Sequence, residues 1–222
     1  MGTTHDFLSM PLEEAISTQR AIRRFKPDPV DDDLVLHLIE LALKAPTGGN
    51  AQNWEFIVVK DAQVKARLAT LNRQAWRIYR SISLRSTAKT DQSTLRMLEA
   101  AEWLAEHLQE TPVLVVACLK GLIPPWPPFA TASLYASIFP SVQNLLLAAR
   151  AAGLGAVLTT LPLWSRFLAR RALGLPWNVT PCAVVPLGWP IGHYGPTRRR
   201  PVEEIVSLDR CGNRAFRSKR NP

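Results

Sequence analysis

Apolar and polar residues follow two periods along the chain, one typical of helices and one typical of strands. Residues 31–45 place apolar side chains three and four positions apart, so one face of a helix would be buried. These side chains are Leu34, Leu38, Leu41, Ala42 and Ala45. Asp31–Asp33 precede them and predict a capped start for this helix.

Helix signals also stand near the start of the chain. Ser9 is a candidate cap, and Pro11 suits the first helical position. Two acidic residues, Glu13 and Glu14, follow in the first turn. The pattern predicts a helix that runs toward Phe25 and ends at the KPDP sequence of residues 26–29.

The remaining elements are predicted by the same two periods. Helical spacing predicts helices over 61–72, 94–109, 131–152 and 163–173. The third of these contains Pro140, and the fourth has Trp164, Phe167 and Leu168 on one side. Runs of β-branched and aromatic residues predict strands over 54–60, 111–119, 156–160 and 181–189. Residues 73–93 carry polar residues and show no clear period.

Helices and strands are mixed without strict β-α-β alternation, which favours the α+β class over a doubly wound parallel sheet. The chain has 222 residues, of which 47% are hydrophobic, so it can bury a substantial core. We find no internal repeat and no linker. Residues 1–222 are therefore predicted to form a single domain.

The charge is strongly basic, with a formal net charge of +9. Such a balance suits nucleic-acid binding. However, much of the excess lies in three short segments, 20–25, 197–200 and 210–220, without interleaved aromatics or a standard nucleic-acid motif. The distribution suits one anionic small molecule, or a solvated surface, at least as well, and no nucleic-acid partner is expected.

The cysteines indicate neither a disulfide framework nor a metal site. Cys118, Cys182 and Cys211 form no CxxC pair, and the four histidines are scattered. Because Cys118 and Cys182 lie in apolar runs, we expect buried thiols. No apolar stretch has the length of a membrane span, and residues 1–10 carry no export signal. We therefore expect no membrane partner and a cytoplasmic location.

The motifs of several enzyme classes are missing. The sequence has no GxGxxG after a predicted strand, no GxxxxGK[ST], no GxSxG and no HExxH. What remains is a distributed set of groups: the basic segment 20–25, the turn APTGGNAQNW at 45–54, the LTT sequence at 158–160 and the arginines at 198–200.

In this order, these groups resemble the flavin-dependent nitroreductase family. QRAIRRF (19–25) is followed by APTGGNAQNWEFIVV (45–59), SVQNLLLAARAAGLGAVLTT (141–160), and then VVPLGWP with RRRPVEEIV (184–190 and 198–206). Each block by itself is weak, but the ordered set spans most of the chain from about residue 12 to 206.

The resemblance implies a nitroreductase-like α+β fold with a central, mostly antiparallel sheet flanked by helices. It implies an intertwined homodimer with one FMN at each end of the interface, touched by both subunits. NADH or NADPH would reduce the flavin, which would then reduce a small-molecule acceptor in a ping-pong cycle. The flavin carries the chemistry, so no catalytic side chain and no metal is expected.

Within the first block, the resemblance places Arg20 at the FMN phosphate and Arg23 at the pyrimidine edge of the ring. On the predicted helix the two arginines share a face, and guanidinium suits phosphate. Ala21 belongs to the same contacting run, where the family has Ser, and Gln19 replaces an Arg. The residues alone fit a solvated basic helix face equally well.

The turn and the LTT sequence would contact the ring. The resemblance implies that Pro46, Thr47, Gly48 and Asn50 come from the partner subunit and cover the flavin. The residues alone also fit a helix C-cap with Gly48–Gly49 ending the helix. Leu158, Thr159 and Thr160 would lie against the ring with a backbone N–H facing flavin N5, although a plain strand end fits the same residues.

Arg199 would be the late phosphate ligand, and Ser137 would lie near a contact between subunits. Asn53 stands where the family has Pro, and Trp54 is expected in the core. The segment 73–91 is where a lid would lie if the protein were a dehalogenase or a flavin-cleaving relative. Its Trp76 and Tyr79 could stack on an aromatic substrate or simply pack. A non-catalytic basic protein that binds flavin or nucleic acid is the third possibility.

Overall fold

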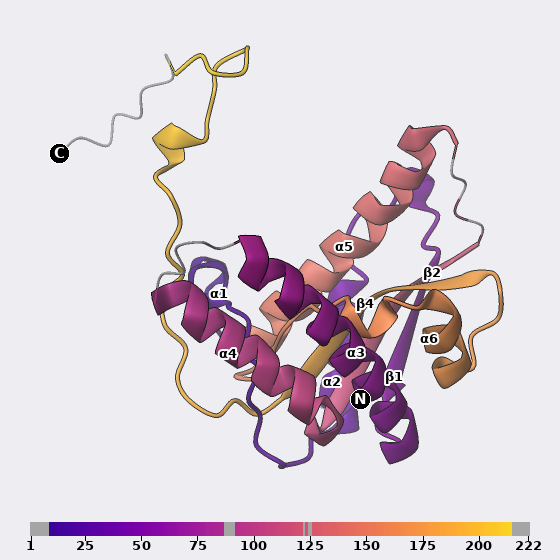
Figure 1. Ribbon diagram of the computed structural model, residues 1–222. Coiled ribbons are helices and arrows are strands. Elements are labelled where there is room, and N and C mark those ends of the chain that lie inside the picture. Colours follow the sequence, from indigo (N-terminus) through magenta and orange to yellow (C-terminus); the bar gives the residue numbers. More distant parts are fainter. Residues whose placement is uncertain (1–8, 87–91, 122, 124–125, 215–222) are drawn as a thin grey trace.

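The computed structural model describes residues 9–86, 92–121, 123 and 126–214 (Figure 1). Residues 87–91, where part of the possible lid was predicted, lie outside this description, as does the end of the basic tail from residue 215. Helices lie on both faces of a central sheet (Figure 1). The chain therefore has the predicted α+β architecture.

The sheet has four strands in the order β1-β2-β4-β3. They are β1 (Trp54–Val59), β2 (Val113–Lys120), β3 (Gly155–Ala156) and β4 (Val179–Gly188). All three pairings are antiparallel, with Phe56 opposite Ala117 and Val116 opposite Val184. The predicted strand over 156–160 is only partly formed, because pairing is limited to β3 and a single bridge between Thr159 and Val184.

Alternate residues of β2 enter two different cores, because side chains of a strand point to opposite faces. Val113, Val115 and Ala117 pack with α2 (Asp32–Ala42) and α5 (Pro128–Ala151). On the other face, Leu114, Val116 and Cys118 pack with helices α3 (Ala62–Ser86), α4 (Gln92–His107) and α6 (Arg166–Leu173). Short 3-10 turns, η2 (Leu108–Glu110) and η3 (Leu161–Leu163), join these helices to the sheet.

The predicted start of α2 is confirmed. The Asp31 carboxylate accepts hydrogen bonds from the backbone N–H groups of Asp33 (2.8 Å) and Leu34 (3.3 Å). The helix ends at Ala42, however, and Gly48–Asn50 form the separate 3-10 turn η1. The reading of Gly48–Gly49 as the end of this helix is therefore wrong.

The first helix, α1 (Leu12–Thr18), is much shorter than predicted. No side chain caps it, so Ser9 is not its N-cap. Residues 19–26 are extended along the sheet edge instead: the Ile22 N–H donates to Ala156 O (3.1 Å) and the Lys26 N–H to Trp189 O (2.8 Å). These bonds replace the helical ones. Arg20 and Arg23 therefore share no helix face, since positions three apart in an extended segment point to opposite sides.

Residues 73–86, which showed no period, continue helix α3. Its inner face carries Leu68, Ala75 and Trp76, all buried, while Thr70 and Gln74 between them face solvent. The helix is hard to recognise because apolar residues such as Ile78 and Ile82 are exposed, so the apolar positions do not follow one buried face. It packs against α4, so the segment where a lid was predicted is part of a helical pair, as far as residue 86.

Helix α5 carries Pro140 in its interior, as predicted, and ends where Gly153 adopts a left-handed conformation (φ +77°). Within the described residues it is the one helix long and apolar enough to cross a membrane by length and composition. Its Ile138, Val142 and Leu145 are completely buried between the sheet and α2. This burial is typical of a core helix.

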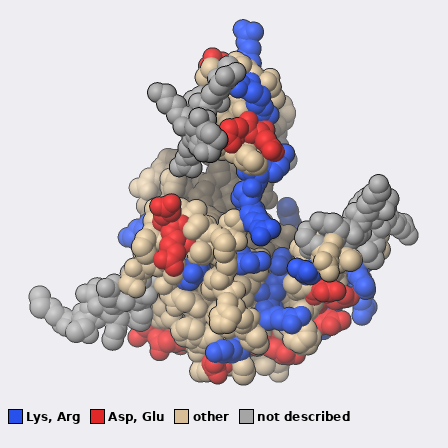
Figure 2. Space-filling view, turned by 90° about the vertical axis from the view of Figure 1, so that its left-hand side faces the viewer, with Lys and Arg blue, Asp and Glu red and all other residues tan. Residues whose placement is uncertain are grey.

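Large apolar side chains are exposed around α6, among other places. The helix predicted over 163–173 begins only at Arg166, so Trp164 precedes it; Trp164, Phe167 and Leu168 are all exposed, while Ala169 and Ala172 are buried. After β4, residues 189–197 still contact residues 17–29, and the segment that contains η4 (Val202–Glu204) then projects away from the body of the molecule (Figure 1). Lys and Arg gather through the middle of the face shown in Figure 2, with smaller groups of Asp and Glu around them.

Candidate functional site

A cavity of about 240 Å³ lies where the extended segment 19–26, helices α3 and α4, and the loop after β3 meet. Its lining is Arg23, Asn72, Trp76, Tyr79, Met97, Ala101, Leu104, Val157, Leu158, Thr159, Thr160 and Leu161. Four residues that the sequence assigned to one cofactor, Arg23 and the LTT residues, thus lie in one cavity. They come from segments more than 130 positions apart in the chain.

The loop after β3 is held against the sheet by a pair of backbone hydrogen bonds. Thr159 and Val184 each donate an N–H to the other's carbonyl oxygen at 2.9 Å. The amide of Thr159 is therefore already used by the sheet. The amides of Leu158 and Thr160 donate to no group in the described part of the chain, so these two amides are available to a ligand.

Arg23 is a cation without a counter-charge among the residues that the structure describes. Its side chain is partly buried, and burial lowers the pKa of its guanidinium. Across the residues that the structure describes, it makes neither an ion pair nor a hydrogen bond. Burying an unpaired charge is costly. The arrangement therefore suits an anionic ligand that enters the cavity.

Asn72 and Trp76, which line the same cavity, each carry a buried polar atom without a partner among the described residues. Asn72 is 2% exposed and Trp76 is 5% exposed. The Asn72 Oδ1 and the Trp76 Nε1 have no hydrogen-bond partner among the described residues. Buried polar groups nearly always have a partner. A ligand acceptor would satisfy the Trp76 Nε1, and a ligand donor would satisfy the Asn72 Oδ1 as it is assigned in this structure.

Asn72 was missed by the sequence reasoning. The signal that could have found it is a polar residue on the buried face of α3, between Leu71 and Ala75. It is one of only five buried polar side chains in the described part of the molecule. Because the helix was predicted to end at residue 72, its inward face was not visible from the pattern.

The other predicted phosphate ligands lie outside the cavity lining. Arg20 and Ala21 are exposed, and the Arg20 Nη1 is 3.8 Å from the position that a Cβ on Gly195 would take. Thr197 donates from its backbone N–H and its hydroxyl to Ser17 O at 2.9 and 3.1 Å. The segments that carry Arg20 and Arg199 thus run beside each other. Arg199 is exposed, and its Nη1 donates to Arg198 O (2.9 Å).

The predicted cofactor turn packs elsewhere. The Gly48 N–H donates to the Ser137 hydroxyl at 3.3 Å, which holds the turn against α5, on the other face of the sheet from the cavity. Gly49, Asn50 and Gln52 all have left-handed backbones, with φ between 47° and 58°. Such conformations are costly in Asn and Gln. The single chain does not bring Pro46, Thr47, Gly48 or Asn50 to the cavity.

Two further predictions concern buried residues. Cys118 and Cys182 are buried free thiols, as predicted, and burial raises their pKa to about 12 and about 11. Trp54 lies in the core at 9% exposure, also as predicted. Within the described ranges, no three His, Cys, Asp or Glu side chains gather as a metal site.

Taken together, the cavity belongs to an α+β protein with a site for an anionic ligand that has its own hydrogen-bonding groups. Comparison with known proteins gives the family. The model of the nitroreductase family matches residues 16–189. The chain belongs to the nitroreductase family and is an oxidoreductase of that family. The resemblance seen in its sequence blocks is thereby confirmed.

Three relatives illustrate the breadth of the family. NADH dehydrogenase of Thermus thermophilus is 27% identical over 228 residues, which covers 85% of this chain and 91% of the relative. Iodotyrosine deiodinase of Danio rerio is 28% identical over 197 residues, covering 87% and 65%. A crystal structure of oxidized iodotyrosine deiodinase bound to FMN and 3-iodo-L-tyrosine superposes with a TM-score of 0.66, at 21% identity and with coverage of 90% and 99%. That likeness concerns the fold.

Proposed function

We propose that the protein is an FMN-dependent oxidoreductase that takes electrons from NADH or NADPH. It would reduce a nitroaromatic, quinone-like or related small molecule in a ping-pong cycle. The observation that carries this proposal is Arg23, a partly buried and unpaired cation in a cavity beside the LTT residues. FMN, when bound, supplies the hydride chemistry; the protein binds it, orients it and excludes water.

The unsatisfied atoms of the cavity fit the ring of FMN. The ring's edge carries an N–H and several acceptor atoms, and the reduced ring is anionic. Arg23 supplies positive charge, the Asn72 Oδ1 can accept from an N–H, and the Trp76 Nε1 can donate. The amides of Leu158 and Thr160 are the available backbone donors, so we assign the contact with flavin N5 to one of these two.

The phosphate of FMN would be held at the junction of two segments. Thr197 ties the basic segment 197–200 to the end of α1 through Ser17. This contact brings the backbone of Arg199 into the neighbourhood of Arg20. Both side chains are exposed and can swing onto an anion without losing an ion pair in the described structure. Two guanidinium groups, each with paired N–H donors, bind a phosphate strongly.

We further propose that the complete site needs a homodimer. The single-chain cavity of about 240 Å³ is smaller than the roughly 300–1,000 Å³ of ordinary small-molecule sites. The turn formed by Pro46, Thr47, Gly48 and Asn50 lies on the other face of the sheet. A second chain can present this turn to the cavity, and its strained backbone is then explained by ligand contact.

The test is an absorption spectrum of the purified protein, followed by anaerobic titration with NADH and with NADPH. We expect a yellow protein whose flavin band bleaches with at least one donor. Arg23→Ala should weaken FMN binding by about tenfold or more, because it removes a charge-assisted contact. Arg24→Ala is the matched control, since its guanidinium stacks on Trp103 at 4.5 Å from the ring centroid.

Two results would reject the proposal. One is a colourless protein that takes up no added FMN. The other is tight FMN binding without bleaching by either nicotinamide, which would support the non-catalytic alternative. If Arg23→Ala and Arg24→Ala bound FMN with equal affinity, the proposed role of Arg23 in FMN binding would be rejected.

Reductive dehalogenation is the second candidate reaction, and the aromatic lining of the cavity favours it. Trp76 and Tyr79 line the cavity with ring centroids 5.7 Å apart, and Tyr79 is 47% exposed. An aromatic substrate could therefore stack at this wall. Halide release from a halogenated phenol by the reduced, FMN-loaded protein would identify this reaction. Reduction of a nitroaromatic without any halide release would exclude it.

A further inference from the structure

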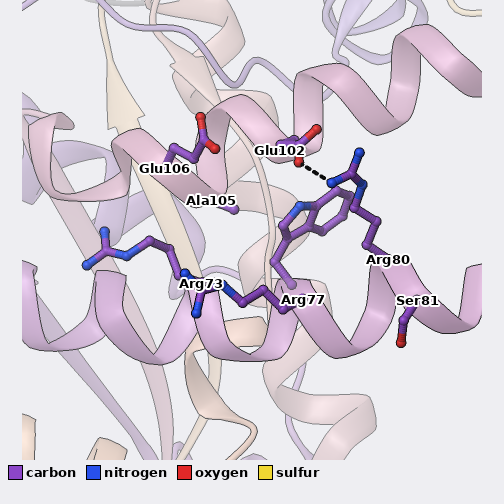
Figure 3. Close-up of a pocket in the computed structure, with 8 residues that line it drawn as sticks. Arg73, Arg77, Arg80, Ser81, Glu102, Ala105 and Glu106 are labelled. Carbon is purple, nitrogen blue, oxygen red and sulfur yellow. Dashed lines mark ion pairs between the residues drawn. The ribbon is translucent and has the colours of Figure 1, made fainter.

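A second cavity, of about 480 Å³, opens between α3 and α4 (Figure 3). We call it the arginine pocket, after Arg73, Arg77 and Arg80 on α3. Glu102 and Glu106 line the pocket from α4, and Figure 3 shows Glu102 directed toward Arg80. The three arginines follow at intervals of four and three residues, so they occupy one side of the helix.

The three arginines differ in what they already bind. The Arg80 Nη1 pairs with the Glu102 carboxylate at 2.9 Å. Arg73 donates to the Gln109 side-chain oxygen (2.9 Å) and to the Thr70 hydroxyl (3.2 Å), which orients its guanidinium. Arg77 has no hydrogen bond or ion pair among the described residues. Figure 3 shows Arg73 and Arg77 extending the same way along α3.

The pocket therefore offers two neighbouring guanidinium groups, of which one is oriented and one is free. With Arg80 neutralised by Glu102, Arg73 and Arg77 outweigh the remaining carboxylate of Glu106. Arginine forks match the oxygens of a phosphate group. Glu106 on the opposite wall suits a hydroxyl donor beside that phosphate. A phosphorylated ribose carries both groups.

The arginine pocket adjoins the candidate FMN cavity. Trp76 lines both, and the two sets of residues alternate along α3: Asn72, Trp76 and Tyr79 line one cavity, and Arg73, Arg77 and Arg80 line the other. A ligand that places one end over a flavin can therefore extend its other end into the arginine pocket. A nicotinamide dinucleotide has this form.

We propose that the arginine pocket binds the 2′-phosphate of NADPH and so makes NADPH the preferred electron donor. NADH carries only a hydroxyl at this position and gains nothing from Arg77. The inference rests on the proposed function, because the donor must reach a bound flavin. The inference goes beyond the proposed function because it names the electron donor and the residues that select this donor.

The kinetic test compares the two donors on the FMN-loaded protein. Arg77→Ala should raise the KM for NADPH by about tenfold, as expected for loss of a charge-assisted contact, and leave the KM for NADH unchanged. Arg67→Ala on the same helix is the matched control, because Arg67 lines a different cavity, between α3 and α6. Equal effects of Arg77→Ala on both donors would overturn the proposal.

A binding test separates this inference from the proposed function. Calorimetry with 2′,5′-ADP and with 5′-AMP is carried out on the protein with and without FMN. We expect 2′,5′-ADP to bind about tenfold more tightly, and Arg77→Ala to remove the difference. Arg77→Lys retains the positive charge but not the paired N–H donors of arginine, so it should restore part of the difference in affinity.

The outcomes are distinct. Equal affinity for the two nucleotides, or an unchanged difference in Arg77→Ala, would reject the pocket even if FMN binds and turns over. If inorganic phosphate displaced NADPH as strongly as 2′,5′-ADP does, the assignment of the pocket to a nucleotide would be rejected. An Arg77-dependent preference in a protein that takes up no FMN would support the pocket and reject the proposed function.

Discussion

At the scale of single residues, Arg23 and Arg24 are neighbours of identical chemistry in different surroundings. The Arg24 guanidinium lies over the ring of Trp103, an exposed cation-π contact. Arg23 turns the other way into the cavity, where burial lowers its pKa. The alternation follows from the extended backbone. No property of the residue types separates the two arginines. The family resemblance named Arg23, and the extended backbone explains why Arg23, and not Arg24, lines the cavity.

The buried thiols lead to a prediction on pH. Burial raises the pKa of Cys118 to about 12 and that of Cys182 to about 11, against 9.0 for an ordinary thiol. Above about pH 9 the unfolded chain loses protons that the folded chain retains, so the free energy of unfolding should fall as the pH rises. Each thiol contributes up to about 1.4 kcal/mol per pH unit within its window.

Chemical denaturation at several pH values between about 8 and 11 measures this slope. Cys118→Ala and Cys182→Ala should each flatten it. Cys211→Ala is the control, because Cys211 is exposed. An alkaline slope that is the same in all three variants and the parent would contradict the assignment.

At the scale of elements, the segment 19–26 decides the geometry of the site. It lies against β3 because Gly155 leaves room: a Cβ there would stand 2.6 Å from Ile22 Cγ2. Its backbone is satisfied by Ala156 and Trp189. The local signals at residues 11–14 favour a helix, and the sheet edge, which is distant in sequence, ends it early. In contrast, α2 was predictable because the Asp31 cap and its apolar stripe are local.

The close approach at Gly155 can be tested directly. Gly155→Ala should destabilise the fold by about 1–3 kcal/mol, as overpacking usually does, and should weaken FMN binding by moving Arg23. Gly195→Ala is the control for stability, since its nearest contact would be an ordinary 3.8 Å from the flexible Arg20 side chain. Denaturant midpoints measure the stability of both variants. A Gly155→Ala midpoint equal to that of the parent would contradict the close packing of Gly155 against Ile22.

At the scale of the whole molecule, the residues predicted from sequence to contact the flavin ring fall into two groups on opposite faces of the sheet. Arg23 and the LTT residues line the cavity, and the 46–50 turn lies on α5. The exposed apolar residues of the projecting C-terminal segment, Val202, Ile205 and Leu208, also suit contact with a second chain. Both features support the proposed homodimer.

Complementation between two defective chains tests whether the site is shared. We choose Arg23→Ala on the cavity side and Asn50→Glu on the turn, and expect each homodimer to lose most FMN affinity. A purified heterodimer would hold one site with both defects and one with neither, because each site takes the cavity from one chain and the turn from the other. Its FMN content should therefore recover to about half of the parent value, as shared-site symmetry requires.

The heterodimer also provides the contrary outcome. If each site lay within one chain, both sites of the heterodimer would carry one defect and no flavin would be recovered. A monomer in light scattering that nevertheless binds FMN normally would reject the shared site by another route.

The sequence by itself determined the family, the antiparallel α+β class, the capped helix α2 and the identity of the basic and Gly/Asn segments. These follow from local periodicity and from motifs that need no distant partner. Only the tertiary structure decided the early end of α1, the length of α3 and the inward position of Asn72. Each depends on hydrogen bonds and packing between residues far apart in the chain, which no local pattern records.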